Sequence, residues 1–253
     1  MNSLSNKTAL ITGGGSGIGR AISCELAELG ARVCIHYFSS ADSARELAGQ
    51  IKDKGGAAFT AGADLTREEE VNRLFSELTH QFDGLDILIN NAGDLVARHP
   101  LEEMSYEFYR KVLAVNLDSM MLVTRKAIGL MKNRGGASIV NIASLAGRKG
   151  GHGGSLIYAT AKGAVLTFTR ALSTELASYG IRVNAIAPGL ILGSRFHEVH
   201  TTEQSKRETI AGIPLGRAGT CEDIARAAAF LASEYDGFIT GATLDINGGV
   251  YMA

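Results

Sequence analysis

Tyr158 and Lys162 are the two residues whose types and spacing most clearly suggest chemistry. They stand four positions apart at the start of an amphipathic helical pattern, so the phenol and the ammonium are predicted to share one helix face. General acid/base work near neutral pH requires a tyrosine pKa about 3 units below its usual value near 10, or about 4 kcal/mol. A single ammonium at about 4 Å supplies about that much at an effective dielectric of about 20. The spacing therefore predicts a tyrosine whose pKa is lowered by the neighbouring lysine.

Because a tyrosine and a lysine at this spacing also occur by chance, polar residues elsewhere must support the interpretation. Ser144 follows one apolar, strand-like run, and Asn90 to Gly93 closes another. Parallel strands bring such positions to one edge of a sheet, where ligands bind. Asn116 interrupts a long helical pattern in which asparagine is mildly unfavourable. We expect the Ser144 hydroxyl to hold a substrate oxygen beside Tyr158.

The segment from Thr12 to Gly19 follows the first predicted strand and leads into a helical pattern. Its glycines allow a sharp turn and a close approach of the main chain to a pyrophosphate. The N–H groups and the positive end of the following helix favour the same anion. The spacing is GxxxGxG rather than GxGxxG, so the position between strand and helix is the stronger part of the signal. The residues predicted to bind a dinucleotide here are Gly13, Ser16, Gly17, Ile18 and Gly19.

The end of the second predicted strand bears on which dinucleotide binds. Sites that prefer NAD usually carry an acidic residue there to hold the ribose 2′-hydroxyl. Here the stretch reads His36-Tyr-Phe-Ser-Ser40, with no carboxylate before Asp42. Ser39 and Ser40 can donate hydrogen bonds to a 2′-phosphate, although no arginine stands in the glycine turn or directly after the strand. We therefore predict NADP(H) in preference to NAD(H), with NAD(H) as the alternative.

Seven short apolar runs alternate with helical patterns from end to end of the chain. Such runs are typical of strands buried on both faces, and their alternation with helices indicates βαβ units with right-handed crossovers. The predicted strands are Thr8–Thr12, Arg32–His36, Ala57–Gly62, Leu85–Asn90, Ser138–Ile142, Arg182–Ala187 and Thr243–Asp245. No linker or internal repeat divides the chain. The sequence predicts one α/β domain over residues 1–253, with a parallel sheet covered by helices on both faces.

Composition argues against several classes of function. The net charge of −1 offers no basic field to nucleic acid or anionic lipid, so neither is expected as a partner. The three cysteines are widely spaced, and His197 and His200 lack a supporting ligand cluster, so no metal site is predicted. No signal-peptide core or long apolar run occurs, and we expect a soluble cytoplasmic protein.

Taken together, these motifs resemble those of the short-chain dehydrogenase/reductase family. They are Thr12-Gly-x-x-x-Gly-Ile-Gly19, Asn90-Asn-Ala-Gly93, Asn116, Ser144, Tyr158-x-x-x-Lys162 and Pro188-Gly189, and they occur in the family's order over essentially the whole chain. The resemblance implies a seven-stranded Rossmann fold and commonly a homotetramer. It also implies hydride transfer between a nicotinamide cofactor and a carbonyl or secondary alcohol.

The resemblance further implies roles for single residues. Tyr158 would be the general acid/base, and Lys162 would lower its pKa and bind the nicotinamide ribose. Ser144 would hold the substrate oxygen, and Asn116 would position a water in a proton relay. The other implied cofactor contacts are Asp64 and Leu65 on the adenine side, Asn91, Ala92 and Gly93 beside the ribose, and Pro188, Gly189 and Ile191 near the nicotinamide. The family's threonine after Pro-Gly is absent, and Ser194 is a candidate substitute shifted by one residue.

The segment at about 190–212 is the least regular part of the chain. It is polar and follows a strand, which favours a substrate lid, with an ordinary surface helix as the alternative. Arg195 in this segment and His152 in the loop Gly150–Gly154 are the candidate substrate-binding residues, and Arg148 is a further candidate for binding an anion.

Three functions remain open at this stage. The expected substrate is a polar carbonyl compound such as a keto sugar or sugar acid, which suits a basic lid. The alternative is a 3-oxoacyl thioester of acyl carrier protein or coenzyme A. A non-catalytic nucleotide-binding sensor is the third, and loss of Tyr158 or Lys162 would favour it; both are present.

Overall fold

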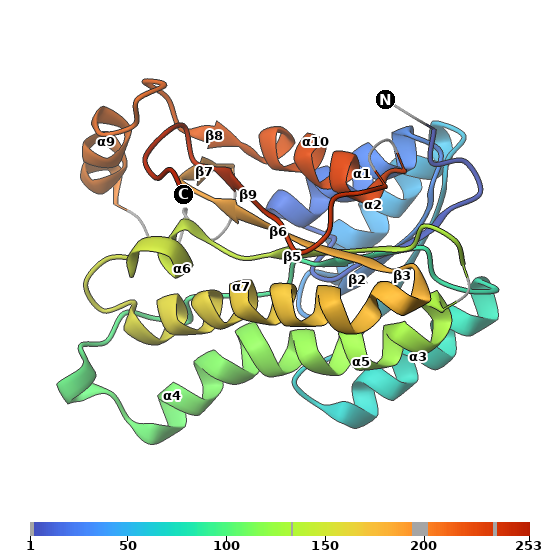
Figure 1. Cartoon of the computed structure of the whole chain (residues 1–253), viewed down its shortest axis with the longest axis horizontal. Helices are drawn as coiled ribbons and strands as arrows, with labels where there is room; N and C mark the ends of the chain where they lie inside the picture. The colour runs from blue at the N-terminus through green and yellow to red at the C-terminus, as the bar shows by residue number, and fades with distance from the viewer. Residues whose placement is uncertain (1–2, 133, 194–201, 235–236) are drawn as a thin grey trace.

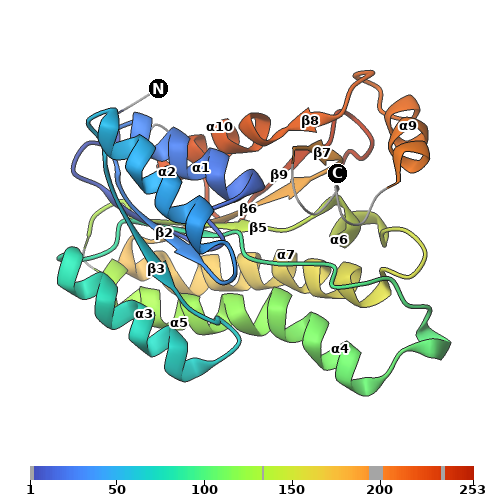
Figure 2. The same ribbon diagram turned by 180° about the vertical axis from the view of Figure 1, so that it is seen from behind.

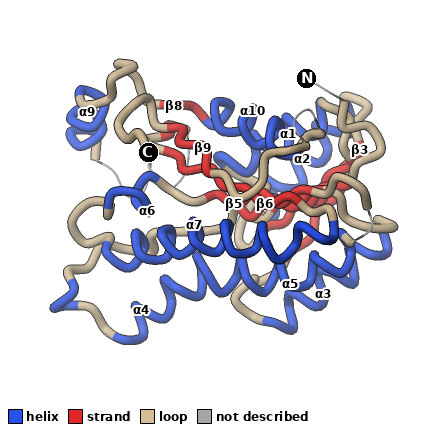
Figure 3. Tube along the Cα trace, viewed as in Figure 1, coloured by secondary structure: helices blue, strands red, loops and turns tan. Residues whose placement is uncertain are grey.

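The computed structural model describes residues 3–132, 134–193, 202–234 and 237–253. At its centre lies a parallel sheet of seven strands in the order β3-β2-β1-β4-β5-β6-β9, drawn in red between the helices in Figure 3. The strands are β1 (Thr8–Ile11), β2 (Arg32–Tyr37), β3 (Ala57–Gly62), β4 (Ile87–Asn90), β5 (Ser138–Ile142), β6 (Arg182–Pro188) and β9 (Thr243–Ile246). The seven predicted strands are confirmed, with ends that differ by at most two residues.

Helices cover both faces of this sheet, as Figures 1 and 2 show from opposite sides. One face carries α1 (Gly17–Glu28), α2 (Ala41–Asp53) and α10 (Cys221–Ala232). The other carries α3 (Glu68–Gln81), α5 (Ser119–Met131) and α7 (Leu156–Leu176), and α4 (Tyr106–Leu113) extends the line of α5. Shorter pieces are η1 (Leu101–Glu103), η2 (Ala114–Asp118), α6 (Leu145–Lys149), η3 (Ala177–Tyr179) and α9 (Glu203–Ala211). This is the expected Rossmann-type α/β domain.

The central strands β1 and β4 are mostly apolar because each face of the sheet is buried there. In β1, Ile11 points to the cluster that contains α1, α2 and α10, whereas Leu10 points to the cluster that contains α3, α5 and α7. In β4, Ile89 and Leu88 alternate in the same way. The strand period of two residues therefore supplies both cores from one run of apolar side chains.

The strand order reverses between β1 and β4, which are neighbours although two strands separate them in the chain. In open parallel sheets this reversal leaves a crevice at the carboxyl ends of the strands, because the connections on its two sides leave toward opposite faces. The glycine turn after β1 and the Asn90–Gly93 segment after β4 both begin at this point.

The predicted lid segment contains regular structure. β7 (Ile191–Leu192) pairs with β8 (Gly219–Thr220), and α9 follows with Thr202 as its N-cap, whose side chain accepts a hydrogen bond from the Ser205 N–H. No α9 residue is buried, and the helix stands apart from the sheet at one end of the molecule (Figure 1). Residues 194–201, including Ser194, Arg195, His197 and His200, lie outside the described part of the chain.

No helix within the described residues is long and apolar enough to cross a membrane. Within the same residues, no group of three or more His, Cys, Asp or Glu side chains has an arrangement that could hold a metal ion.

Candidate active site

The glycine turn forms a cradle lined by main chain. Gly13 and Gly17 adopt φ values of +62° and +50°, which residues other than glycine rarely adopt. A Cβ at Gly19 would collide with the Gly13 carbonyl oxygen and lie 2.6 Å from Asn91 Nδ2. α1 starts at Gly17, and its N-cap, Ser16, makes no side-chain capping bond. The turn therefore presents a close main-chain surface and a helix N-terminus, which suits a pyrophosphate.

Thr12 joins this turn to the segment after β4. Its hydroxyl oxygen accepts hydrogen bonds from the main-chain N–H groups of Asn91, at 2.9 Å, and Ala92, at 3.0 Å. The side-chain Nδ2 of Asn91 donates in return to the carbonyl oxygens of Thr12, at 2.9 Å, and Gly13, at 3.3 Å. The two predicted cofactor segments are thus held together at the strand reversal, and Asn91 binds the turn directly. The role of Thr12 was not predicted from the sequence.

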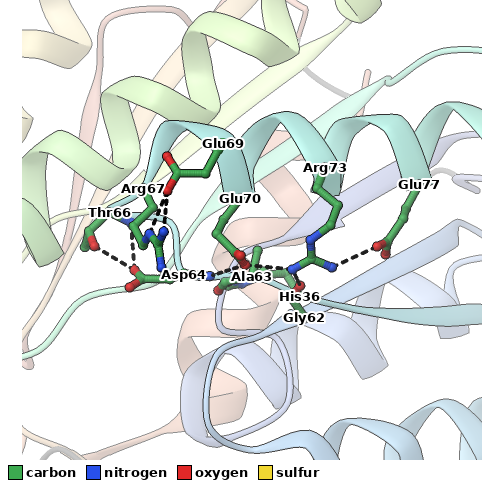
Figure 4. A network of polar contacts seen from close by, with 10 residues as sticks. All are labelled: His36, Gly62, Ala63, Asp64, Thr66, Arg67, Glu69, Glu70, Arg73 and Glu77. Carbon is green, nitrogen blue, oxygen red and sulfur yellow. Dashed lines mark hydrogen bonds and ion pairs between the residues drawn. The ribbon is translucent and has the colours of Figure 1, made fainter.

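The predicted adenine side lies at the end of β3 (Figure 4). One carboxylate oxygen of Asp64 accepts hydrogen bonds from the N–H of Thr66, at 3.0 Å, and from its hydroxyl, at 2.7 Å. The side chain of Leu65 is buried beside Thr12 and Ala92, so it belongs to the wall behind the site.

Ser39 and Ser40 stand at the N-terminal end of α2. Ser39 is exposed, and Ser40 is the N-cap of the helix yet makes no side-chain capping bond. Asp42, the nearest carboxylate, is fully exposed and forms an ion pair with Arg45. A phosphate at this position would therefore meet two hydroxyls and the positive end of a helix.

Asn116 lies in η2, a π-helical turn between α4 and α5, where the sequence pattern predicts a continuous helix. Such turns widen a helix locally and are frequent at functional sites. The buried Asn116 amide donates to the carbonyl oxygen of Asp94 at 2.6 Å and accepts from its N–H at 3.1 Å. Asn116 therefore fixes the main chain directly after Gly93.

Gly93 lies between Asn116 and Lys162. A Cβ at this glycine would be 2.7 Å from Asn116 Oδ1 and 3.0 Å from Lys162 Nζ. The two side chains therefore approach the same point of the main chain. Only glycine leaves room for both.

Tyr158 is hydrogen-bonded to Ser144, so the two hydroxyls predicted to hold a substrate oxygen lie together. The Ser144 hydroxyl oxygen also accepts from the Ala146 N–H at 3.1 Å, because Ser144 caps α6. Burial raises the pKa of Tyr158 to about 12; the bond to Ser144 acts in the opposite direction, and the charge of Asp94 raises it further. At neutral pH Tyr158 is therefore a protonated phenol.

The predicted lowering of the Tyr158 pKa by Lys162 is not what the structure shows. The buried Lys162 ammonium donates to the Ile142 carbonyl oxygen at 2.9 Å and lies 5.8 Å from the centre of the Tyr158 ring. Burial lowers the pKa of Lys162 itself to about 8. Desolvation, which the spacing of two residues cannot reveal, dominates both groups.

Arg148 and His152, two residues predicted to bind substrate, lie in other surroundings than expected. Arg148 forms a bidentate ion pair with Asp245, at 3.0 and 2.9 Å, in which both side chains are 15% exposed. It ties α6 to β9 and is already paired, so its prediction as an anion-binding residue is wrong for this structure. His152 is exposed and lines a cavity of about 620 Å³ whose lining includes neither Ser144 nor Tyr158.

The predicted nicotinamide side follows β6. Pro188 is the last residue of that strand and is buried. A Cβ at Gly189 would be 2.9 Å from the Asn247 Cα, so this glycine permits a close crossing of two chain segments. Ile191 is buried in the apolar cluster of α1 and α10. Its side chain therefore packs in the core, and only the main chain of Ile191 could make the predicted contact with the cofactor.

Known proteins resemble this chain along its whole length. The model of a family described as Enoyl-(Acyl carrier protein) reductase matches residues 13–251. A 3-oxoacyl-(acyl-carrier-protein) reductase of Staphylococcus epidermidis is 36% identical over 247 residues, which are 98% of this chain and 100% of that protein.

Solved structures resemble this chain in fold over nearly its whole length. A provisionally named gluconate dehydrogenase from Agrobacterium tumefaciens has a TM-score of 0.92 at 31% identity, covering 99% of this chain and 98% of that one. A blue fluorescent protein from a metagenomic library, in complex with NADPH, has a TM-score of 0.91 at 31% identity, covering 99% and 100%. The protein therefore belongs to the short-chain dehydrogenase/reductase family and is an NAD(P)-dependent oxidoreductase that acts on CH–OH groups.

Proposed function

We propose that this enzyme uses NADPH to reduce the 3-oxo group of an acyl thioester to a hydroxyl. The observation that carries the proposal is the state of Tyr158, which is half-buried, hydrogen-bonded to Ser144 and protonated at neutral pH. A ketone that accepts a hydride needs a proton donor at its oxygen, and this pair of hydroxyls supplies one.

The cofactor site fits a dinucleotide. The Gly13–Gly19 turn would hold the pyrophosphate, Asp64 the adenine side, and Lys162 the nicotinamide ribose. When bound, NADPH supplies the hydride. Support for NADP(H) over NAD(H) comes from the two serines and the helix N-terminus after β2. The carboxylate of Asp42, in the first turn of that helix, is exposed and paired with Arg45.

The residues of the chain then act on the substrate oxygen. Ser144 and Tyr158 donate hydrogen bonds to the carbonyl, which polarises it and orients its carbon. As negative charge develops on that oxygen, Tyr158 transfers its proton to it. Lys162 and Asn116 lie on the route by which a proton returns to Tyr158, because both meet the main chain at Gly93.

Charge near these hydroxyls favours a neutral carbonyl over a sugar acid. Arg148, one of the residues expected to bind an anion, is paired with Asp245. Asp94 is exposed and acts on Tyr158 with a negative charge that would repel a substrate carboxylate. The full-length likeness to 3-oxoacyl reductases supports the same choice.

A polyhydroxylated ketone is the second candidate. Asp94 favours it, because a carboxylate accepts hydrogen bonds from neighbouring hydroxyls of such a substrate. The provisional name of the Agrobacterium tumefaciens neighbour fits a substrate of this class.

The test is the initial rate of NADPH oxidation by purified enzyme with acetoacetyl-coenzyme A, keto sugars and keto acids. The proposal expects the highest kcat/KM for the thioester and at least tenfold less for the keto acids. A preference for keto sugars supports the second candidate, and a preference for keto acids contradicts both. NADPH binding without turnover of any carbonyl would favour the sensor function. Repeating the best reaction with NADH measures the cofactor preference.

We also propose that the chain assembles as a homotetramer. Apolar side chains are exposed on the outer face formed by α4, α5 and α7, among them Tyr106 at 76%, Leu156 at 46% and Met121 at 39%. Such exposure fits an interface between copies. Light scattering coupled to size exclusion is expected to give four times the mass of 26.6 kDa. A monomer mass would contradict this assembly.

A further inference from the structure

We infer that His36 is a positioning residue that holds the two halves of the dinucleotide site together through a neutral imidazole. The residue is the fifth of β2 and 1% exposed. No role was predicted for its side chain, because the sequence places it in an apolar strand. The inference rests on the proposed dinucleotide site and adds a residue to it.

The first half is the glycine turn. The N–H of Gly13 donates to His36 Nδ1 at 3.1 Å, and the N–H of Gly14 donates to the His36 carbonyl oxygen at 2.8 Å. Two successive N–H groups of the turn are thus bound to this one residue. They set how the turn leaves β1, and so where the pyrophosphate cradle begins.

The second half is the end of β3. His36 Nε2 lies 3.0 Å from the Ala63 carbonyl oxygen, directly before Asp64 (Figure 4). Because Gly13 donates to Nδ1, Nδ1 carries no proton, and Nε2 must be the protonated nitrogen that donates to Ala63. One ring thereby links the pyrophosphate side of the site to the adenine side.

Only the neutral ring can make both bonds, since an imidazolium has no acceptor for Gly13. Burial lowers the pKa of His36 to about 4, while the bond to Ala63 and the charge of Asp64 act in the opposite direction. Among the described residues, the groups that favour the charged ring are the Ala63 carbonyl and the Asp64 carboxylate. The ring remains neutral throughout the physiological range.

The consequence concerns ligand binding rather than the chemical step. His36 lies at the turn and at β3, and none of its bonds reaches Ser144, Tyr158 or Lys162. Replacement by leucine removes an acceptor from Gly13 and a donor from Ala63, which leaves two main-chain groups without a partner. Replacement by asparagine retains an acceptor at the position of Nδ1 and loses the bond to Ala63.

The experiment combines two readouts. In protein with ¹⁵N-labelled histidine, the wild-type His36 ring is expected to show a protonated Nε2 and an unprotonated Nδ1, unchanged from pH 7.5 to about pH 5.5. The dissociation constant of NADPH, measured by its fluorescence, is expected to rise about tenfold in His36→Leu and about threefold in His36→Asn. The kcat at saturating NADPH should stay within about twofold of wild type. His80→Asn, on the exposed face of α3, is the matched control and should bind NADPH as wild type does.

A protonated Nδ1, or titration of the ring near 6.5, would overturn the inference even if every variant unfolds. Folded His36→Leu with unchanged NADPH affinity would also overturn it, as would an equal loss of affinity in His80→Asn. If wild-type protein binds no NADPH, the proposed function fails, and the expected tautomer would still be seen.

Discussion

Gly93 offers a sharp test of how the site is built, because a single methyl group here would press on Asn116 and Lys162, two of the predicted catalytic residues. The glycine has no positive φ, so alanine is compatible with its backbone. The added Cβ would be 2.7 Å from Asn116 Oδ1 and 3.0 Å from Lys162 Nζ. Real Cβ atoms scarcely occur below 3.0 Å, so one or both side chains must move.

The magnitude follows from the cost of overpacking. One excess methyl group in a well-packed site costs about 1–3 kcal/mol. If the displaced Asn116 and Lys162 express that cost in the transition state, kcat/KM for the carbonyl falls by about 5-fold to about 150-fold.

The assay compares Gly93→Ala with Gly129→Ala and Gly49→Ala. At the two control positions, on α5 and α2, an added Cβ meets nothing within 4 Å. Initial rates at saturating NADPH should fall only in Gly93→Ala, while circular dichroism confirms that all three variants fold. A folded Gly93→Ala with kcat/KM within about twofold of wild type would refute the reasoning.

Three further predictions concern charge. Asp94→Asn removes a charge that raises the pKa of Tyr158. The loss of reductase activity with rising pH should therefore begin at a lower pH than in the wild type. A pH profile of kcat/KM that does not move to lower pH contradicts this. The pKa of His36 is about 4 in the folded state, against the ordinary histidine value of 6.5 in the unfolded state. Between these pH values only the unfolded state binds the proton. The contribution of His36 to stability is therefore fully present above pH 6.5 and is lost as pH falls toward 4. Urea unfolding should therefore give about 2 kcal/mol less stability at pH 5 than at pH 7 from this residue, and His36→Asn should lack that part of the slope. Arg148→Ala should cost about 1–3 kcal/mol by leaving the Asp245 carboxylate unpaired, whereas the double variant with Asp245→Ala should recover part of the loss; no recovery would contradict a paired role.

The fold was predictable because burial on both faces marks each strand in the sequence. A strand buried on both faces, such as Ile87–Asn90, stands out as a nearly continuous apolar run between two helical patterns. Tyr158, Ser144 and Asn116 were predicted as site residues because their residue types fit one reaction and their places follow strands or helices that meet at one edge. The structure brings Ser144 to Tyr158, and Asn116 and Lys162 to Gly93.

The remaining features depend on contacts between segments distant in sequence. Arg148 and Asp245 are 97 residues apart, and only the addition of β9 beside β6 brings them together. Desolvation raises the pKa of Tyr158, whereas its spacing from Lys162 had predicted a lower value. The sequence could not show this, because desolvation depends on every element packed around the residue. His36 could not be distinguished from a core residue, since its two partners lie in other segments.

The central claim is that the Tyr158 hydroxyl gives its proton to a substrate carbonyl beside bound NADPH. Tyr158→Phe removes that hydroxyl and leaves the ring and the cofactor site in place. Measured side by side, NADPH affinity should stay within about threefold of wild type, while kcat for carbonyl reduction should fall by about 10²-fold to 10⁴-fold. Reduction by Tyr158→Phe at a rate close to that of the wild-type enzyme would contradict the account.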